Sequence, residues 1–176
     1  AQQCTSEDSC PDIWPSGIGG FGTCNQAPDL VAYLLVNDVP LVDLDDATVG
    51  NNYLTSFVEG GSTILVSNNM TLTDTDDFNM ESATITLTNN LDGVANENIS
   101  LTPSQISTAL SSFGITVNTI KDKVISLIGS SSKENYKTVI SQIVYKNISK
   151  NPSKSNRIIT IAVSYTHLTL PTTPYV

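Results

Sequence analysis

Short strand-like segments separated by turn signals recur through most of this chain and limit the folds open to it. Residues 81–88 (ESATITLT) alternate strictly, with Ala83, Ile85 and Leu87 on one face and hydroxyl residues on the other. That period of two is typical of an antiparallel strand with one buried and one solvated face. The other strand candidates are residues 53–58, 63–66, 114–120, 124–128, 143–146 and 158–162. Their length and spacing predict an all-β sandwich of about seven strands.

Two segments depart from this pattern and are predicted to be short helices. Residues 102–112 begin with a Thr-Pro pair, and residues 131–143 carry four apolar residues at helical spacing behind a capping box, Ser131 and Glu134. One or two short helices are compatible with a sandwich. The alternating apolar faces predict a core that includes Ile85, Leu87, Ile125, Leu127, Ile143, Tyr145, Ile159 and Ile161.

Composition divides the chain into four parts. Residues 1–28 have turn composition without a period and are expected to be a Cys/Gly-rich remnant of a preceding segment. Residues 29–40 end in Asn-Asp-Val-Pro and are interpreted as a terminal strand and a linker. The sandwich itself is predicted over residues 41–162, and residues 163–176 form a separate tail. Neither a signal peptide nor a membrane anchor is visible, so we interpret the chain as a piece of a longer protein.

Three cysteines, Cys4, Cys10 and Cys24, cluster near the first residues of the chain. An odd number in a short Gly/Pro-rich segment favours disulfides, with one partner lost from the fragment. Free thiols are the second interpretation. Zinc is the third, because a structural zinc site needs four ligands and no histidine lies nearby.

The charged residues are unevenly distributed along the chain, whose net charge is −9. All eight Lys and Arg residues lie between Lys121 and Arg157, whereas fifteen of the seventeen Asp and Glu residues lie at or before Glu97. A long segment without cations repels phosphate backbones, which argues against nucleic-acid binding. Uncompensated carboxylates also repel one another in a compact fold, and a divalent cation relieves that repulsion.

Four ordered blocks, NDVP, NNYLTSFVEGG, LTDTDDFNMESATITLTN and NYKTVISQIVYKNISKNPSKSNRIITIAVS, together resemble one cadherin-like repeat over residues 37–162. Such repeats occur in tandem in extracellular surface and adhesion proteins. The resemblance implies a Greek-key, immunoglobulin-like sandwich. It further implies a calcium site in which a linker, here Asn37 and Asp38, meets an Asp-x-Asp loop, here Asp74 and Asp76.

The chemistry of these residues is compatible with calcium. Calcium takes six to eight oxygen ligands, and carboxylates two residues apart on a loop, with a linker carboxylate, supply several of them. Asp77 and Asn79 are further candidates for the same cage. The alternative is that the Asp-rich loop is a solvated turn, where aspartate is favoured.

Other acidic residues offer weaker candidates for metal ligands. Glu59 matches a glutamate that related cadherin domains use at the opposite linker, although the Asp-Arg-Glu element of true cadherins is absent here. The alternative is that Glu59 is a simple turn glutamate. Asp43, Asp45 and Asp46 are interpreted as solvated charges. A helix-loop-helix calcium loop is excluded there because Thr48 and Leu54 occupy the positions that need Gly and Glu.

The tail VSYTHLTLPTTPYV, residues 163–176, resembles the reading-frame translation of a common transposase-based sequencing adapter. We therefore expect it to contribute nothing to the fold, the alternative being a native Thr/Pro-rich linker. The only histidine, His167, lies in this tail. Without a histidine elsewhere, no Ser-His-Asp, Cys-His or HExxH arrangement is available, and we expect no catalysis.

Three sequons, at Asn69, Asn98 and Asn147, are candidates for N-glycosylation and agree with an extracellular or cell-surface location. The function predicted is that of a calcium-binding structural or adhesion repeat of a larger surface protein. Its expected partners are neighbouring repeats of the same chain, with another cell-surface protein or a glycan as further options. The parent protein is expected to be at the cell surface, and membrane anchoring is one option for it. The alternative is a ligand- or carbohydrate-binding accessory sandwich of an extracellular protein or hydrolase.

Overall fold

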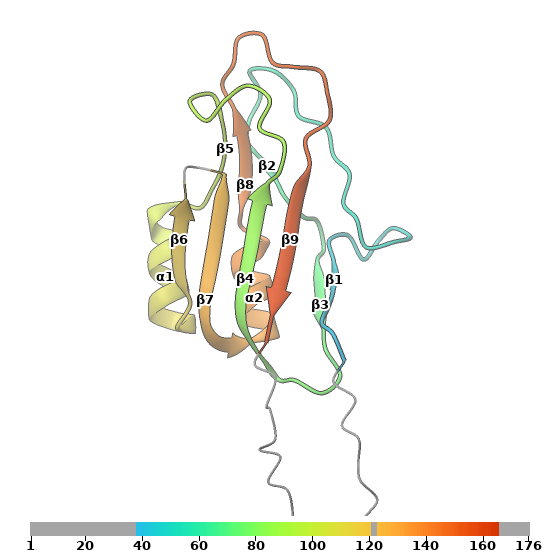
Figure 1. The fold of residues 1–176 in the computed structure, drawn as a ribbon, viewed down its shortest axis with the longest axis vertical. Coiled ribbons are helices and arrows are strands. Elements are labelled where there is room, and N and C mark those ends of the chain that lie inside the picture. Colours follow the sequence, from blue (N-terminus) through green and yellow to red (C-terminus); the bar gives the residue numbers. More distant parts are fainter. Residues whose placement is uncertain (1–37, 121–122, 166–176) are drawn as a thin grey trace, which may run out of the picture. The chain divides into compact units, whose positions relative to one another are not determined.

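The computed structural model describes residues 38–120 and 123–165, and the statements below concern these residues. The chain divides into two units, Ala1–Val36 and Asn37–Val176, and every described residue belongs to the second. Within the described ranges, nine strands form three antiparallel sheets, and two helices complete the fold (Figure 1). The fold therefore belongs to the all-β class that the sequence predicts, with nine strands instead of about seven.

The largest sheet has the order β6-β7-β4-β9, formed by β6 (Thr116–Ile120), β7 (Val124–Ser132), β4 (Asn79–Leu87) and β9 (Ile159–Ser164). A second sheet has the order β2-β8-β5, formed by β2 (Ile64–Leu65), β8 (Val144–Asn147) and β5 (Glu97–Ser100). Strand β1 (Leu41–Asp43) pairs with β3 (Thr71–Thr73). Helix α1 (Pro103–Phe113) precedes β6, and α2 (Lys133–Ile140) connects β7 to β8.

The alternation predicted for β4 is confirmed. Ala83, Ile85 and Leu87 are buried, whereas the threonine and serine residues between them are exposed or half-buried. β4 is also a central strand, paired with β7 on one side and β9 on the other, so its apolar face lies in the middle of the core. Six of the eight predicted core residues are buried, and the remaining two, Ile159 and Ile161, are half-buried and pack against the core.

The prediction of a strand at residues 53–58 is wrong, and three short strands were not predicted. Residues 52–58 have no strand structure, because no neighbouring segment pairs with them. The missed strands are β1, β3 and β5, which have three or four residues each. A run that short cannot display a period of two, and β5 (ENIS) further lacks the apolar composition of a strand.

Both predicted helices form, but their caps differ from the expectation. Helix α1 has a capping box: the backbone N–H of Gln105 donates to the Thr102 hydroxyl, and the Gln105 side chain accepts from the Thr102 N–H. The capping box predicted for α2 is wrong by one residue. Ser132, not Ser131, caps α2 by accepting from the N–H of Asn135, and Ser131 instead lies near the end of strand β7.

Strand β9 continues beyond Ala162, where its end was predicted. Val163 pairs with Ala83 and Ser164 with Ser82, because β4 extends far enough to supply partners. Val163 and Tyr165 also pack against the core. The first residues of the predicted tail are therefore part of the fold, contrary to the expectation, and residues 166–176 lie outside the described residues.

A β-bulge in β7 brings two elements into close contact. The register between β4 and β7 shifts between Met80 and Ser82, so that β7 contains one extra residue there. Gly129 lies at this shift with φ of 142°, and a Cβ on it would lie 2.3 Å from the carbonyl oxygen of Gly114, which ends α1. Only glycine fits this approach.

We expect Gly129→Ala to destabilise the fold by about 2–3 kcal/mol, because the added methyl group meets rigid backbone and the residue has a positive φ. Gly60→Ala is the matched control: Gly60 also has a positive φ, but a Cβ added there would meet nothing within 4 Å. That control should cost about 1–2 kcal/mol from backbone strain alone. Urea unfolding of both variants measures the difference, and equal losses would contradict the close approach at Gly129.

Candidate metal site

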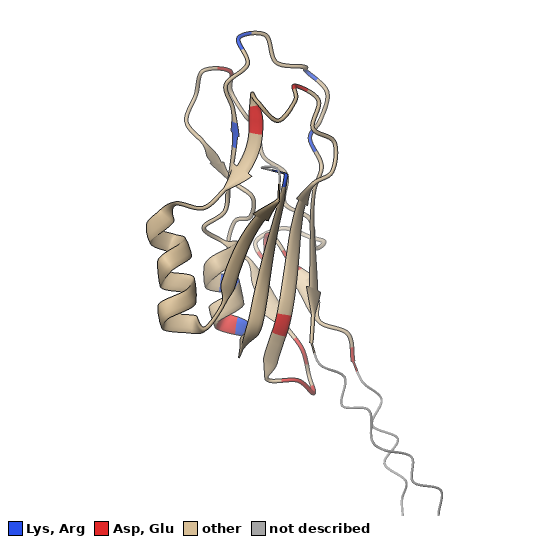
Figure 2. Ribbon diagram, turned by 60° about the vertical axis from the view of Figure 1, so that its left-hand side comes forward, with Lys and Arg blue, Asp and Glu red and all other residues tan. Residues whose placement is uncertain are grey.

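Three aspartates gather in the acidic loop, which is defined as residues 74–77 between β3 and β4. Asp74, Asp76 and Asp77 each place a carboxylate oxygen within 4.8 Å of the others. The loop is held by Asp74, whose Oδ1 accepts from the backbone N–H groups of Asp76 (3.2 Å) and Asp77 (2.9 Å). Figure 2 shows acidic residues along this loop, and others at the opposite end of the unit. The sequence predicted this grouping.

The predicted linker residue Asp38 lies against the acidic loop. Its N–H donates to the Asp76 carboxylate at 3.2 Å, and the Thr75 hydroxyl donates to the Asp38 carboxylate. Of the expected ligands, Asp38, Asp74 and Asp76 are therefore brought together and Asp77 joins them. Asn79 does not, since its amide donates to the hydroxyl of Ser130 at 3.4 Å. Asn37 lies outside the described residues.

The two central carboxyl groups of the loop differ in their pKa. Desolvation alone would raise the pKa of Asp74, but hydrogen bonds from the N–H of Asp77 and from Asp76 lower it below its ordinary value. The pKa of Asp76 is raised, first by desolvation and then by its hydrogen bond to Asp74. Asp76 is therefore the first of the pair to take up a proton as the pH falls.

A lysine reaches the acidic loop, although the expectation was that these carboxylates have no nearby cation. The ammonium of Lys133, the first residue of α2, donates to the carbonyl oxygens of Asp74, at 2.7 Å, and Asp77. Its charge also helps to lower the pKa of Asp74. Lys133 occupies loop carbonyls but not the carboxylates, and Oδ2 of Asp74 is buried without a hydrogen-bond partner.

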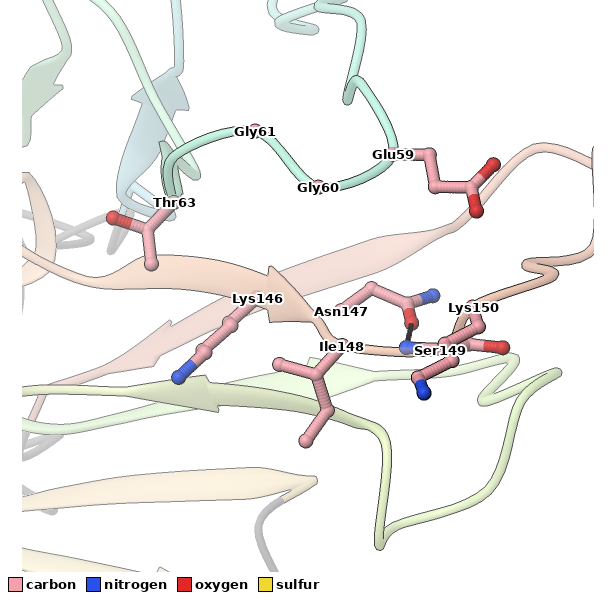
Figure 3. A pocket seen from close by; sticks show the side chains of 9 residues that line it. All are labelled: Glu59, Gly60, Gly61, Thr63, Lys146, Asn147, Ile148, Ser149 and Lys150. Atoms are coloured by element: carbon pink, nitrogen blue, oxygen red, sulfur yellow. Dashed lines mark hydrogen bonds between the residues drawn. The ribbon is translucent and has the colours of Figure 1, made fainter.

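Glu59 lies apart from the acidic loop. It is exposed and lines a cavity of about 350 Å³ together with Lys146 and Lys150, at the end of β8 (Figure 3). The acidic loop lies at the other end of the strands, between β3 and β4 (Figure 1). The structure thus does not bring Glu59 together with the other expected metal ligands.

One of the three aspartates interpreted as solvated is buried. The side chain of Asp45 is 8% exposed, and it accepts hydrogen bonds from the Asn68 amide (3.3 Å) and the Thr48 hydroxyl (3.4 Å). These bonds tie together the loops after β1 and β2. Asp46 is exposed and Asp43 half-buried, so the interpretation as solvated charge holds for Asp46 alone.

A buried cluster of charged and polar residues, which the sequence did not predict, lies at the end opposite the acidic loop. The carboxylate of Glu97 is fully buried and accepts from Arg157 Nε (2.6 Å), the Tyr145 hydroxyl (2.8 Å) and two backbone N–H groups of residues 91 and 92. Arg157 also forms an ion pair with Asp92. Each charge is thus compensated by hydrogen-bonded partners.

The pKa values of this buried cluster keep it ionised at neutral pH. Burial alone would raise the pKa of Glu97, but hydrogen bonds from the Asp92 N–H, Arg157 and Tyr145 lower it. The pKa of Asp92 is lowered by hydrogen bonds from the N–H of Ser153 and from the amide of Asn147. Burial, together with Glu97, raises the pKa of Tyr145 to about 12, so its hydroxyl remains a donor.

The three sequons differ in their accessibility. Asn69 is exposed in a turn with a φ of 48°, and Asn98 is half-buried in β5. Asn147 is buried, and its Nδ2 donates to Asp92 at 2.6 Å and to the Tyr145 hydroxyl at 3.3 Å. A glycan on that nitrogen is incompatible with both hydrogen bonds, so the folded unit does not present Asn147 as an acceptor.

A groove of about 680 Å³ lies between residues 52–57, strand β2 and residues 151–159. Its floor includes Phe57 and Tyr145, whose rings meet edge to face with centroids 5.3 Å apart. Hydroxyl and amide side chains of both irregular segments complete the lining. Its volume falls in the range of ligand-binding sites.

Comparison of the chain with protein-family models, with curated proteins and with solved structures finds no match. Within the described residues, no helix is long and apolar enough to cross a membrane. The cysteine predictions at Cys4, Cys10 and Cys24, and the position of His167, lie outside the described residues.

We expect Glu97→Gln to destabilise the fold by about 3 kcal/mol at pH 7, because it leaves Arg157 buried with half of its compensation. Carboxyl groups with lowered pKa stabilise the folded state above their unfolded pKa of about 4, and this contribution is lost as the pH falls through their folded values. Denaturant unfolding at several pH values below 7 should show a weaker acid-induced loss for Glu97→Gln than for the wild type. Glu59→Gln, at an exposed carboxylate, should change neither the free energy of unfolding at pH 7 nor its decrease at lower pH. A loss of less than about 0.5 kcal/mol in Glu97→Gln would contradict the role of the cluster.

Proposed function

We propose that this unit is a calcium-binding, non-catalytic structural module of a larger extracellular protein. The observation that carries the proposal is the convergence of Asp74, Asp76 and Asp77 with Asp38, a residue that lies 36 positions before Asp74 in the chain. Hard oxygen ligands in this number suit calcium better than a softer metal. An extracellular location is part of the proposal and rests on the cysteine cluster and the exposed sequon.

The oxygen atoms of the acidic loop that have no hydrogen-bond partner are the expected ligands of the calcium ion. Lys133 takes up the carbonyl oxygens of Asp74 and Asp77, so carboxylates would supply the protein ligands and water the remainder. The unpartnered Oδ2 of Asp74 is the first candidate ligand. Because few protein ligands are available and a cation is already close, we expect a Kd of about 10⁻⁴ to 10⁻³ M, typical of extracellular modules.

A cadherin-like, immunoglobulin-like Greek-key sandwich remains the finer form of this proposal, with neighbouring repeats as partners. The placement of the chain ends modifies it. Asp38 contacts Asp76, and Ser164 pairs with Ser82, so the described chain enters and leaves at the end that holds the acidic loop (Figure 1). The resemblance would instead place the second linker near Glu59, at the opposite end. We therefore favour a module that projects from its parent chain over a link in a linear array.

The groove supports a second candidate function, the binding of a ligand. It is lined by residues 53–57 and 151–159, which lie away from the acidic loop, so the groove is open to a partner while the unit is attached at the end that holds this loop. The two functions are compatible, with calcium fixing the point of attachment and the groove binding the ligand.

Calcium should raise the unfolding temperature of the wild-type chain in a concentration-dependent manner, since it binds only the folded state. Asp74→Ala combined with Asp76→Ala should abolish that shift. The measurement is a thermal melt in EDTA and in about 5 mM calcium, a concentration above the expected Kd. The calcium effect should decrease as the pH approaches the raised pKa of Asp76, because a protonated carboxyl group cannot bind the ion.

Two further variants control this experiment. Asp46→Ala removes an exposed carboxylate outside the acidic loop and should retain the full calcium shift. Glu59→Ala should also retain it, because Glu59 lies in a different cavity. If the wild type and the double variant respond alike to calcium, the acidic loop is a solvated turn and the proposal fails.

A further inference from the structure

Two segments that follow one another in the chain, residues 52–57 and strand β2, both line the groove without pairing. Residues 52–57 and strand β2 are joined through Gly60 and Gly61, and the N–H of Gly61 donates to the carbonyl of Val58 at 2.9 Å, as in a tight turn. Beyond that turn no hydrogen bond joins the two segments among the described residues. Instead, both line the same groove. The two segments are therefore unpaired with each other and contribute to the same groove.

Both walls carry unpaired backbone groups. In the part of the chain that the structure describes, no residue of the segment 52–57 takes part in a hydrogen bond, although its sequence (NYLTSF) has strand composition. On the other wall, the N–H of Val66 donates to Ile143, and Ile64 pairs with Tyr145. In an antiparallel pair these positions alternate, so the N–H and C=O of Leu65 point away from β8. Strand β2 is the edge of its sheet.

Several of the side chains that line the groove are apolar or aromatic and could pack against a bound peptide strand. Tyr53 and Phe57 are half-buried, and Leu54 and Leu65 are 90% and 47% exposed. The third wall, residues 151–157, is held in place by Arg157, which donates to the carbonyl oxygens of Ser153 (2.8 Å) and Ser155 (2.6 Å). The groove thus has one wall anchored to the buried cluster, an edge strand, β2, and an irregular segment, residues 52–57, without backbone partners among the described residues.

The charges around the groove favour an acidic ligand. Lys154 and Glu59 line the groove, and Lys146 and Lys150 line the adjoining cavity, which Glu59 also borders (Figure 3), so that three lysines face one glutamate. None of these three lysines forms an ion pair among the described residues. Arg157 is already compensated by Asp92 and Glu97. Figure 2 shows basic residues, together with some acidic ones, at the end of the unit opposite the acidic loop.

We propose that the groove binds an extended acidic peptide segment of a partner protein by β-strand addition between residues 52–57 and β2. The unpaired backbone groups would supply affinity, and the lysines would select for acidic side chains. This inference rests on the second candidate function, ligand binding in the groove, and does not depend on calcium. Unpaired peptide groups on both walls favour a peptide over a glycan, which has no alternating backbone donors and acceptors.

The test measures binding of fluorescein-labelled, capped octapeptides to the full chain by fluorescence polarisation. In these probes Glu alternates with Val or Thr, and matched peptides contain Lys in place of Glu. The acidic peptides should bind saturably below about 1 mM, more weakly at high salt, and alike in calcium and in EDTA. Lys154→Glu should weaken binding about fivefold, and the control Lys123→Glu, at a lysine outside the groove lining, should not.

Backbone pairing is tested separately by N-methylation of alternate residues in the acidic peptide. In one peptide the methylated residues are those whose N–H groups point to one wall of the groove, and binding should weaken at least about tenfold. In the second peptide the residues between them are methylated. Their N–H groups point to a wall with fewer donors and acceptors, so binding should weaken less. Equal affinity of both methylated peptides and the parent peptide would overturn strand addition. Binding of a uronic-acid oligosaccharide without binding of any acidic peptide would overturn the peptide inference and leave ligand binding standing. Absence of binding by either probe would overturn both.

Discussion

The architecture depends on a fully buried carboxylate that is ionised. Glu97 lies in β5, and Arg157, its ionic partner, lies 60 residues further along the chain. An uncompensated charge in this position would cost several kcal/mol, so the fold is stable only if residues 91–97 and 151–157 are brought together. Because Arg157 also holds the carbonyl oxygens of Ser153 and Ser155, the same ion pair determines the course of an irregular loop. That loop in turn forms one wall of the groove.

The two ends of the unit differ in which charged residues they hold and in how these residues are paired. At the groove end, Asp92 and Glu97 share Arg157 as their ionic partner, and Lys146, Lys150 and Lys154 lie in the same region as the exposed Glu59. At the other end, four aspartates meet, and the ammonium of Lys133 occupies the backbone carbonyls between them. The groove end thus combines cations with carboxylates and has a small excess of positive charge, whereas carboxylates outnumber cations at the acidic loop.

The sequence predicted those features that depend on residues close to one another in the chain. The alternation in β4 follows from one apolar face, and the grouping of Asp74, Asp76 and Asp77 follows from their position in one loop. Features that depend on distant partners were not predictable in this way. Lys133 reaches a carbonyl 59 residues earlier, and the pairing of Glu97 with Arg157 has no signal in either segment alone. The strand prediction at residues 53–58 failed for the same reason, because strand composition does not supply a neighbour to pair with.

The positions at which the described chain enters and leaves have a consequence for how such a unit can be combined with others. Asp38 lies against Asp76, and Ser164 pairs with Ser82, at one end of the same sheet system. A domain with adjacent ends can be accommodated within a surface loop of a host protein without separating the two halves of the host. The first and last described residues of this unit therefore lie at the same end of the fold, as they do in domains that are inserted into a loop of another protein.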